Sequence, residues 1–252
     1  SNLGPLLFLL FINDIVEHIS SEKLLFADDL KLFFEINTID DCRILQTNIN
    51  TVVEWCNTNR LSLNKKKCFV VSYTKKQEPI IFNYNIDAVT LNRGEKYKDL
   101  GITFDSRLMF NDHMTEIVSK AYRMYGFIYR NCNDFLNIST LCNLYYALVR
   151  SQLEYGVLIW FPIYEIHIKN IESVQRKFLK FLSYRSSGVY PDRGCDHLQL
   201  LNQFNFISLE IRRIIHTISF LHKLVNNKID CVILLDKIRF IVPRVHSRQF
   251  LT

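Results

Sequence analysis

The segment Leu24–Phe34, "LLFADDLKLFF", constrains the fold of this chain most strongly, because two adjacent aspartates interrupt an apolar run. Adjacent carboxylates repel each other, and burying them between apolar segments adds a desolvation cost. A tight turn that exposes Asp28 and Asp29 removes this cost, and a bound cation offsets it. Because short turns tolerate aspartate, the segment predicts two buried strands, Leu24–Ala27 and Leu30–Phe34, joined as a hairpin. These residues alone leave a plain turn and a cation site both open.

The composition bounds the class of protein. The chain has 252 residues and 48% hydrophobic residues, enough for one large domain or two ordinary ones with a sizeable core. Its seven cysteines include no C-x-x-C pair, which favours reduced thiols in the cytosol or nucleus and a protein that is not secreted. Cys195 and His197 lie close together, but without a second pair of ligands we interpret them as ordinary residues.

The beginning of the chain is apolar. "SNLGPLLFLLFIND" lacks an initiator Met and a basic leader, so it is a poor signal peptide, and the run is too short to span a bilayer. We expect no membrane association and a chain that is a fragment of a longer protein. Pro5 suits the first turn of a helix, which predicts a buried helix over Leu6–Ile19.

The charge is distributed unevenly. Residues 1–59 contain three Lys or Arg and nine Asp or Glu, a balance of −6, whereas residues 60–252 have a balance of +12. An acidic segment that could hold cations therefore precedes a basic segment that could hold a polyanion. This arrangement suits a protein that acts on nucleic acid, although a solvated basic surface gives the same excess.

The first part of the chain predicts a mixture of helices and strands. Thr38 and Asp41 resemble a capping box, and the residues that follow have apolar side chains at helical spacing. "LSLNKKKCFVVSY" ends that helix and continues into a strand, and further strands fit Ile80–Phe82 and Tyr97–Phe104.

The pattern becomes helical near Leu108, where we place a domain boundary. Asn111 and Ser139 are candidate N-caps, and helices then follow through apolar positions at helical spacing, the last of them over Ile211–Val225. A third helix carries its apolar residues at Ile168, Ile171, Val174, Phe178 and Leu182. The predicted fold class is therefore α+β, with a mixed part over residues 1–108 and an all-helical basic part over residues 109–252.

Five segments in this order resemble the reverse transcriptase of non-LTR retrotransposons, in particular the jockey-like group. They are "LGPLLFLLFINDI", "FADD", "EWCNTNRLSLNKKKC", "YKDLGITFDSRLMF" and "QLEYGVLIW". The resemblance covers nearly the whole chain. The resemblance implies a partial polymerase palm, an antiparallel sheet with helices, over residues 1–108. It implies a helical thumb and C-terminal region over residues 109–252.

The resemblance also implies roles for individual residues. Asp28 and Asp29 match the catalytic, metal-binding aspartates of the palm hairpin, where two Mg²⁺ ions assist phosphoryl transfer. Asn64 and Lys67 match an N-x-x-K pattern, which places Lys67 near the triphosphate as a catalytic residue. The element "KYKDLGITFD" resembles the primer grip, whose matching residues are Tyr97, Leu100 and Gly101.

The resemblance implies an RNA template, a DNA primer and deoxynucleoside triphosphates as partners. The family has a further metal-binding aspartate on an earlier strand, and we expect that strand to precede residue 1, so that this chain alone is inactive. Asp14, Glu17 and Glu22 are interpreted as surface acids. One alternative is a non-catalytic nucleic-acid-binding remnant that uses the basic helical region through Arg176, Lys177 and Lys180. Another is a protein-interaction module with an acidic turn and no metal.

Overall fold

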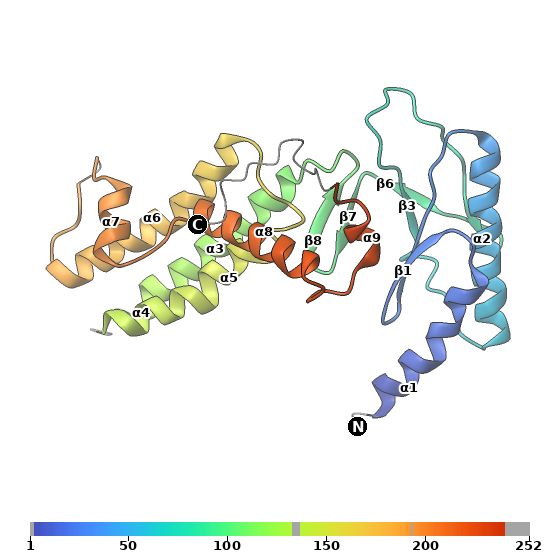
Figure 1. Ribbon diagram of the computed structural model, residues 1–252, viewed down its shortest axis with the longest axis horizontal. Helices are drawn as coiled ribbons and strands as arrows, with labels where there is room; N and C mark the ends of the chain where they lie inside the picture. Colours follow the sequence, from blue (N-terminus) through green and yellow to red (C-terminus); the bar gives the residue numbers. More distant parts are fainter. Residues whose placement is uncertain (1–2, 133–136, 193, 240–252) are drawn as a thin grey trace, which may run out of the picture. The chain divides into compact units, whose positions relative to one another are not determined.

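The computed structural model of the chain describes residues 3–132, 137–192 and 194–239 (Figure 1). The chain divides into two compact units, Ser1–Met109 and Phe110–Thr252. The elements combine helices with small sheets, as the predicted α+β class requires. The interpretation of the two parts as a palm and a thumb stays a prediction.

The first unit contains two α-helices, one 3₁₀-helix and eight short strands among its described residues. They are α1 (Leu3–Ile12), η1 (Asn13–His18), β1 (Glu22–Phe26), β2 (Asp29–Phe33), α2 (Ile39–Thr58), β3 (Phe69–Val71), β4 (Asn85–Ile86), β5 (Val89–Thr90), β6 (Asn92–Gly94), β7 (Lys96–Asp99) and β8 (Ile102–Asp105).

The strands pair only in twos, whereas we expected one antiparallel sheet. Three pairs, β1–β2, β4–β5 and β7–β8, are antiparallel, and β3 pairs with β6 in parallel. Because these strands are two to five residues long, each makes only a short ladder with its partner. The described part of this unit therefore holds its strands together mainly through side chains and through α2.

The apolar start of the chain is helical but not buried, so the expectation of a buried helix over Leu6–Ile19 was wrong. α1 ends at Ile12, and η1 follows as a 3₁₀-helix. Ile12, Ile15 and Ile19 join a core cluster with α2, while most side chains of α1 are exposed; Leu10 is 76% exposed. The reason is geometric, because α1 extends away from α2 and its contacts with that core come from its C-terminal half, from Phe8 to Ile12 (Figure 1).

Helix α2 begins where the sequence predicted it. The Thr38 hydroxyl accepts a hydrogen bond from the backbone N–H of Asp41, and the Asp41 carboxylate accepts one from the backbone N–H of Thr38, which together form a capping box. These hydrogen bonds lower the pKa of Asp41; the largest contribution comes from the backbone N–H of Asn37. Val52, Trp55 and Cys56 of α2 belong to the core cluster.

Two predicted strands differ from the structure. Ile80–Phe82 is not a strand: Ile81 is exposed, and the carbonyl oxygen of Phe82 accepts a hydrogen bond from the Arg93 side chain. The segment Tyr97–Phe104 is not one strand but the hairpin β7–β8, which turns at Leu100 and Gly101. Both turn residues have positive φ values, 45° and 88°, which glycine adopts without strain.

The second unit is helical throughout its described residues. Its helices are α3 (Asn111–Asn131), α4 (Ile138–Leu144), the π-helical turn η2 (Tyr145–Arg150), α5 (Ser151–Glu154), α6 (Glu165–Ser187), α7 (His197–Gln203), α8 (Leu209–Val225) and α9 (Val232–Leu235). The expected helices through Ile171 and over Ile211–Val225 are confirmed as α6 and α8.

The two expected caps of this unit were wrong by one or two residues. Phe110, not Asn111, is the N-cap of α3, in a left-handed conformation without a side-chain hydrogen bond. Asn137, not Ser139, caps α4, because its side-chain oxygen accepts hydrogen bonds from the N–H groups of Ser139 and Thr140. A cap residue lies before the first helical turn, where its side chain can reach those free donors.

The core of the second unit forms around α6. Phe178, Leu179 and Leu182 are fully buried, and the ring of Tyr145 stacks on that of Phe178 at a centroid distance of 4.2 Å. Trp160 is also fully buried and donates its indole N–H to the Tyr155 carbonyl oxygen. Among the described residues, no helix is long and apolar enough to cross a membrane.

Candidate functional site

The two aspartates lie at the tip of the hairpin that the sequence predicted. β1 and β2 pair in antiparallel register, with Phe26 opposite Asp29, so Ala27 and Asp28 form the turn. Both aspartates are exposed, and so they do not bear the desolvation cost of a buried pair. Ala27 has a φ of 52°, a left-handed conformation that costs a non-glycine residue roughly 1–2 kcal/mol. The tip therefore stores a small amount of backbone strain.

The strands of this hairpin are not buried as we expected. Leu24 and Phe26 are each 60% exposed, whereas Leu25, Leu30 and Leu32 pack against the core cluster of α2 and η1. Side chains alternate between the two faces of a strand, so one face of the hairpin covers the core and the other is open. The aspartate at position 29 belongs to the open face, opposite Phe26.

The described residues offer Mg²⁺ a donor set of the right kind but of small size. Asp28 and Asp29 provide two exposed carboxylates, and Mg²⁺ binds through one or two carboxylates while it keeps several waters. No group of three or more His, Cys, Asp or Glu that could hold a metal occurs in the part of the chain that the structure describes. Asp14, Glu17 and Glu22 are exposed, as the surface interpretation expects.

The aspartate hairpin contacts the hairpin β7–β8 through charged and aromatic side chains. Lys31 Nζ lies 2.7 Å from Asp99 Oδ1, and both side chains are only 18% exposed. The pKa of Tyr97 is raised, first by burial and then by the negative charges of Asp99 and Asp29. Tyr97 therefore lies within electrostatic reach of one of the two aspartates.

The residues predicted as primer-grip-like occupy β7 and its turn. Tyr97 is on β7, and its ring lies 4.7 Å from that of Phe69 on β3, measured between centroids. Leu100 and Gly101 form the turn that follows, and the Leu100 side chain is 48% exposed. The structure therefore brings Tyr97 toward the aspartates and leaves the tip of its hairpin on the surface.

The lysine cluster forms a turn between α2 and β3. The backbone N–H of Lys67 donates a hydrogen bond of 2.9 Å to the carbonyl oxygen of Asn64, and the Lys67 side chain is exposed. Its neighbour Lys65 forms an ion pair with Asp87 at 2.5 Å. The exposed ammonium of Lys67 is available to an anionic ligand, whereas that of Lys65 is paired with the Asp87 carboxylate.

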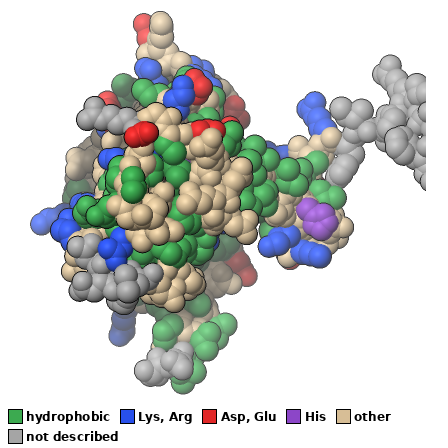
Figure 2. Space-filling model, turned by 90° about the vertical axis from the view of Figure 1, so that its left-hand side faces the viewer, with side chains coloured by type: hydrophobic (Ala, Val, Ile, Leu, Met, Phe, Trp, Pro, Cys, Tyr) green, Lys and Arg blue, Asp and Glu red, His purple; other side chains and the backbone are tan. Residues whose placement is uncertain are grey.

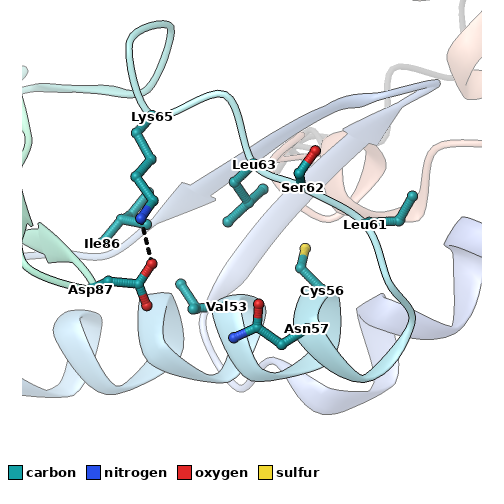
Figure 3. Close-up of a pocket in the computed structure, with 9 residues that line it drawn as sticks. All are labelled: Val53, Cys56, Asn57, Leu61, Ser62, Leu63, Lys65, Ile86 and Asp87. Atoms are coloured by element: carbon teal, nitrogen blue, oxygen red, sulfur yellow. Dashed lines mark hydrogen bonds and ion pairs between the residues drawn. The ribbon is translucent and has the colours of Figure 1, made fainter.

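A cavity of about 220 Å³ lies beside this turn (Figure 3). Figure 3 shows the Lys65–Asp87 pair on one side and Asn57 and Cys56 of α2 on another. Its lining is Val53, Cys56, Asn57, Leu61, Ser62, Leu63, Lys65, Ile86 and Asp87. None of the predicted site residues lines it, so the cavity is separate from the aspartate tip.

The predicted nucleic-acid-binding residues share helix α6, but two of them have partners within the protein. Arg176 donates a hydrogen bond to the Cys195 carbonyl oxygen, and Lys180 donates one to that of Asp192. Lys177 is exposed, and its Nζ lies 4.5 Å from the centroid of the Tyr122 ring. On the face in Figure 2, Lys and Arg side chains occur at several separate places among exposed hydrophobic groups.

Among the charged contacts that the sequence did not predict, three lie at or between elements of interest. They are the ion pairs Lys31–Asp99 and Lys65–Asp87 and a cluster in which Glu154 lies near Arg150, Arg212 and His216. The Arg150–Glu154 spacing could have suggested part of the last one, because residues four apart share a helix face. The others join positions far apart in the chain, for which a single sequence gives no signal. His197 Nε2 lies 3.6 Å from Glu172 Oε2, another contact between positions far apart in the chain.

Comparisons with known proteins match this chain to one family by sequence. Residues 1–104 match the family "Reverse transcriptase (RNA-dependent DNA polymerase)". The chain is 26% identical over 195 residues to the "Probable RNA-directed DNA polymerase from transposon BS" of Drosophila melanogaster. The aligned segment covers 73% of this chain and 22% of the relative. The chain is also 26% identical over 195 residues to the "Probable RNA-directed DNA polymerase from transposon X-element" of the same species. That aligned segment covers 73% of this chain and 21% of the relative.

A third relative is the "RNA-directed DNA polymerase from mobile element jockey" of Drosophila melanogaster. It is 25% identical over 196 residues, which cover 73% of this chain and 21% of the relative. This chain thus spans only about a fifth of the length of the curated relatives it matches, 22% of the first and 21% of the others. No solved structure matches it significantly.

Proposed function

We propose, from the membership of residues 1–104 in the reverse transcriptase family, that this chain is part of an RNA-directed DNA polymerase of a non-LTR retrotransposon. The proposed reaction is RNA-templated DNA synthesis, in which a DNA primer is extended with deoxynucleoside triphosphates. The observation that carries the proposal is the hairpin β1–β2, which presents Asp28 and Asp29 side by side at its tip within the matched segment.

In this proposal the two aspartates are the metal-binding and catalytic carboxylates. Their exposed oxygens fit Mg²⁺, which in a two-metal site stabilises the attacking and leaving oxygens of an in-line displacement. The strained turn at Ala27 and the packed leucines of β2 fix the backbone that carries these carboxylates. A pre-oriented carboxylate needs no reorganisation when charge develops in the reaction.

Lys67 is proposed to bind the triphosphate and to protonate the leaving pyrophosphate. Its ammonium is exposed and follows a turn closed by Asn64, the other residue of the N-x-x-K pattern. Tyr97, Leu100 and Gly101 are proposed to contact the primer from the hairpin β7–β8. The first unit then corresponds to part of a palm, and the helical second unit to a thumb and the region beyond it.

We further propose that these 252 residues do not extend a primer without the rest of the polymerase. Two carboxylates are a small ligand set for two metal ions, and the chain corresponds to about a fifth of its relatives, 22% of the first. Misplacement of a reacting group by about 1 Å can lower a rate roughly 100-fold. The chain is therefore expected to bind metal weakly and to lack measurable incorporation.

A chimaera tests the function. Residues 1–104 would replace the matching segment of the transposon BS polymerase, and extension of an oligo(dT) primer on poly(rA) would be measured with Mg²⁺. We expect extension by the chimaera, its loss in Asp28→Asn and Asp29→Asn, and its retention in Glu22→Gln, an exposed acid of β1. The isolated chain of 252 residues, assayed alongside, should show no extension.

Two results would contradict the proposal. One is a chimaera that is folded by circular dichroism and retains Mn²⁺ binding but extends no primer, while the parent polymerase does. The other is extension that survives both aspartate substitutions. Robust extension by the isolated chain would overturn only the proposed inactivity.

A further inference from the structure

We infer that the ion pair between Lys31 and Asp99 is a positioning device that anchors the aspartate hairpin on β7–β8 and holds Asp29 within electrostatic reach of Tyr97. The inference rests on the proposed function, because it gives the pair the role of orienting a metal-binding carboxylate. It adds Lys31 and Asp99 to the residues that the reaction requires, although neither is expected to contact substrate or metal.

The alternation of side chains along a strand determines which residues of β2 and of β7 share a face. Side chains two positions apart share one face of a strand, so Asp29 and Lys31 lie on the same face of β2. By the same rule Tyr97 and Asp99 lie on one face of β7. The ion pair of 2.7 Å joins Lys31 of β2 to Asp99 of β7. The charge of Asp29, on the same face of β2 as Lys31, contributes to the raised pKa of Tyr97.

On the face of the hairpin that carries Asp29, the apolar side chains of β1 are largely exposed. Leu24 and Phe26 are paired with Lys31 and Asp29 in the register of the hairpin, and both are 60% exposed. The leucines of the opposite face pack on the core, so they fix the hairpin as a whole but not the side that presents the carboxylate. On the Asp29 face the ion pair of Lys31 with Asp99 links the hairpin to β7–β8.

The environment makes this ion pair stronger than an ordinary surface pair. Lys31 and Asp99 are 18% exposed each, whereas Arg43 and Asp40, another pair of the same unit, are 71% and 78% exposed. Exposed pairs contribute little because water and salt screen them, and shielded pairs are screened much less. A shielded pair with one short contact also restricts the rotamers of both side chains.

The first test measures the coupling between Asp29 and Tyr97 in the full chain of 252 residues, without metal or nucleic acid. Tyrosine labelled with ¹³C at Cζ would report the titration of Tyr97, assigned with Tyr97→Phe. A nearby carboxylate disfavours phenolate, so Asp29→Asn should lower the midpoint in the parent. In the background of Lys31→Met, Asp29→Asn should shift the titration midpoint of Tyr97 by less than half as much. Lys31→Asp with Asp99→Lys should restore it.

Lys65→Met is the matched control, since it removes one partner of another ion pair in the same unit and should leave the coupling unchanged. Circular dichroism would show that each variant is folded. An equal response of Tyr97 to Asp29→Asn in the parent and in Lys31→Met would overturn the inference. So would the absence of any response in the parent.

The second test measures Mn²⁺ binding by electron paramagnetic resonance of the free ion. Loss of a group that orients a metal ligand lowers affinity about tenfold at the least, and we expect a fall of that order in Lys31→Met, with recovery in the charge exchange. Removal of a positive charge near the carboxylates would by itself raise affinity, so a fall reports lost positioning. Unchanged or higher affinity in Lys31→Met would refute the positioning role.

The two tests also separate this inference from the proposed function. If Asp28→Asn and Asp29→Asn leave Mn²⁺ binding of the parent chain unchanged, the metal site of the proposed function is wrong. The Tyr97 titration would still decide whether the ion pair holds Asp29, because that measurement needs no metal.

Discussion

The hydroxyl of Tyr145 donates a 3.0 Å hydrogen bond to Oε1 of Gln175, deep within the helical unit. The Gln175 amide donates in turn to the carbonyl oxygen of Ile207. This chain of hydrogen bonds links η2, α6 and the segment that precedes α8. Both side chains are fully buried, so no solvent replaces a lost partner.

We expect Tyr145→Phe to lower the free energy of unfolding by about 1–3 kcal/mol, the cost of leaving a buried polar group without a partner. The ring and its stacking on Phe178 remain, so the change isolates the hydroxyl. Urea denaturation followed by circular dichroism measures the effect. Tyr164→Phe, at a position that is 51% exposed, is the control and should be near neutral. A loss as small as that of the control would show that the hydrogen bond contributes little.

Alkaline pH should destabilise the same unit. Burial raises the pKa values of Tyr145 and Tyr125 above the ordinary value of about 10. A group whose pKa is higher in the folded state contributes stability that is fully present below the unfolded pKa and is lost as pH rises above it. Stability measured by urea denaturation should therefore fall above about pH 10, and more steeply in the parent than in Tyr145→Phe. Equal slopes in the two proteins would contradict this assignment.

Two neighbouring arginines of α8 should respond in opposite directions to the same substitution. Arg213 is 1% exposed, and none of its three guanidinium nitrogens has a hydrogen-bond partner among the described residues. Burial lowers its pKa, which reflects the cost of charge at this position. Arg212, in contrast, makes two hydrogen bonds to the Glu154 carboxylate.

We expect Arg213→Met to raise the free energy of unfolding by roughly 1–3 kcal/mol, because it removes unsatisfied buried donors. Arg212→Met should lower it, since the Glu154 carboxylate, which is 14% exposed, loses its closest partner. Thermal and urea unfolding of both variants provide the measurement. Destabilisation by Arg213→Met would indicate that its packing or its attraction to Glu172 outweighs the desolvation cost.

The basic residues of α6 allow a separate prediction about nucleic acid. We expect the chain to bind an RNA–DNA duplex without sequence preference, with an affinity that falls linearly with salt on logarithmic axes. Lys177→Gln should reduce the slope by about one, because its ammonium is exposed. Arg176→Gln and Lys180→Gln should have smaller effects, since both side chains hydrogen-bond to carbonyl groups. Fluorescence anisotropy over a salt series measures this, and slopes unaffected by all three changes would exclude this face.

The parts of the site that the sequence predicted are those that depend on neighbours along the chain. The hairpin around Asp28 follows from apolar segments beside a turn-prone pair, and the capping box at Thr38 follows from a spacing of three residues. The turn at Gly101 was missed, although glycine inside a predicted strand is a recognised sign of a turn or bulge.

The features that could not be predicted from the sequence are those that depend on contacts between segments far apart in the chain. Leu24 and Phe26 are the apolar type of residue expected in a buried strand, but each is 60% exposed. The same limit applies to α1, whose apolar side chains reach the core only at Phe8, Phe11 and Ile12 among the described contacts. The partnership of Lys31 with Asp99 joins two hairpins that no local pattern connects.

The parallel pairing of β3 with β6 has a consequence for the order in which the first unit can assemble. The hairpin β1–β2 closes over two residues and needs no other part of the chain, whereas β3 and β6 meet only after the intervening segment has folded back. Closing a longer loop costs more entropy before any contact compensates it. The aspartate tip is therefore a local structure, whereas the ion pair of Lys31 with Asp99 joins positions far apart in the chain and requires a long loop to close.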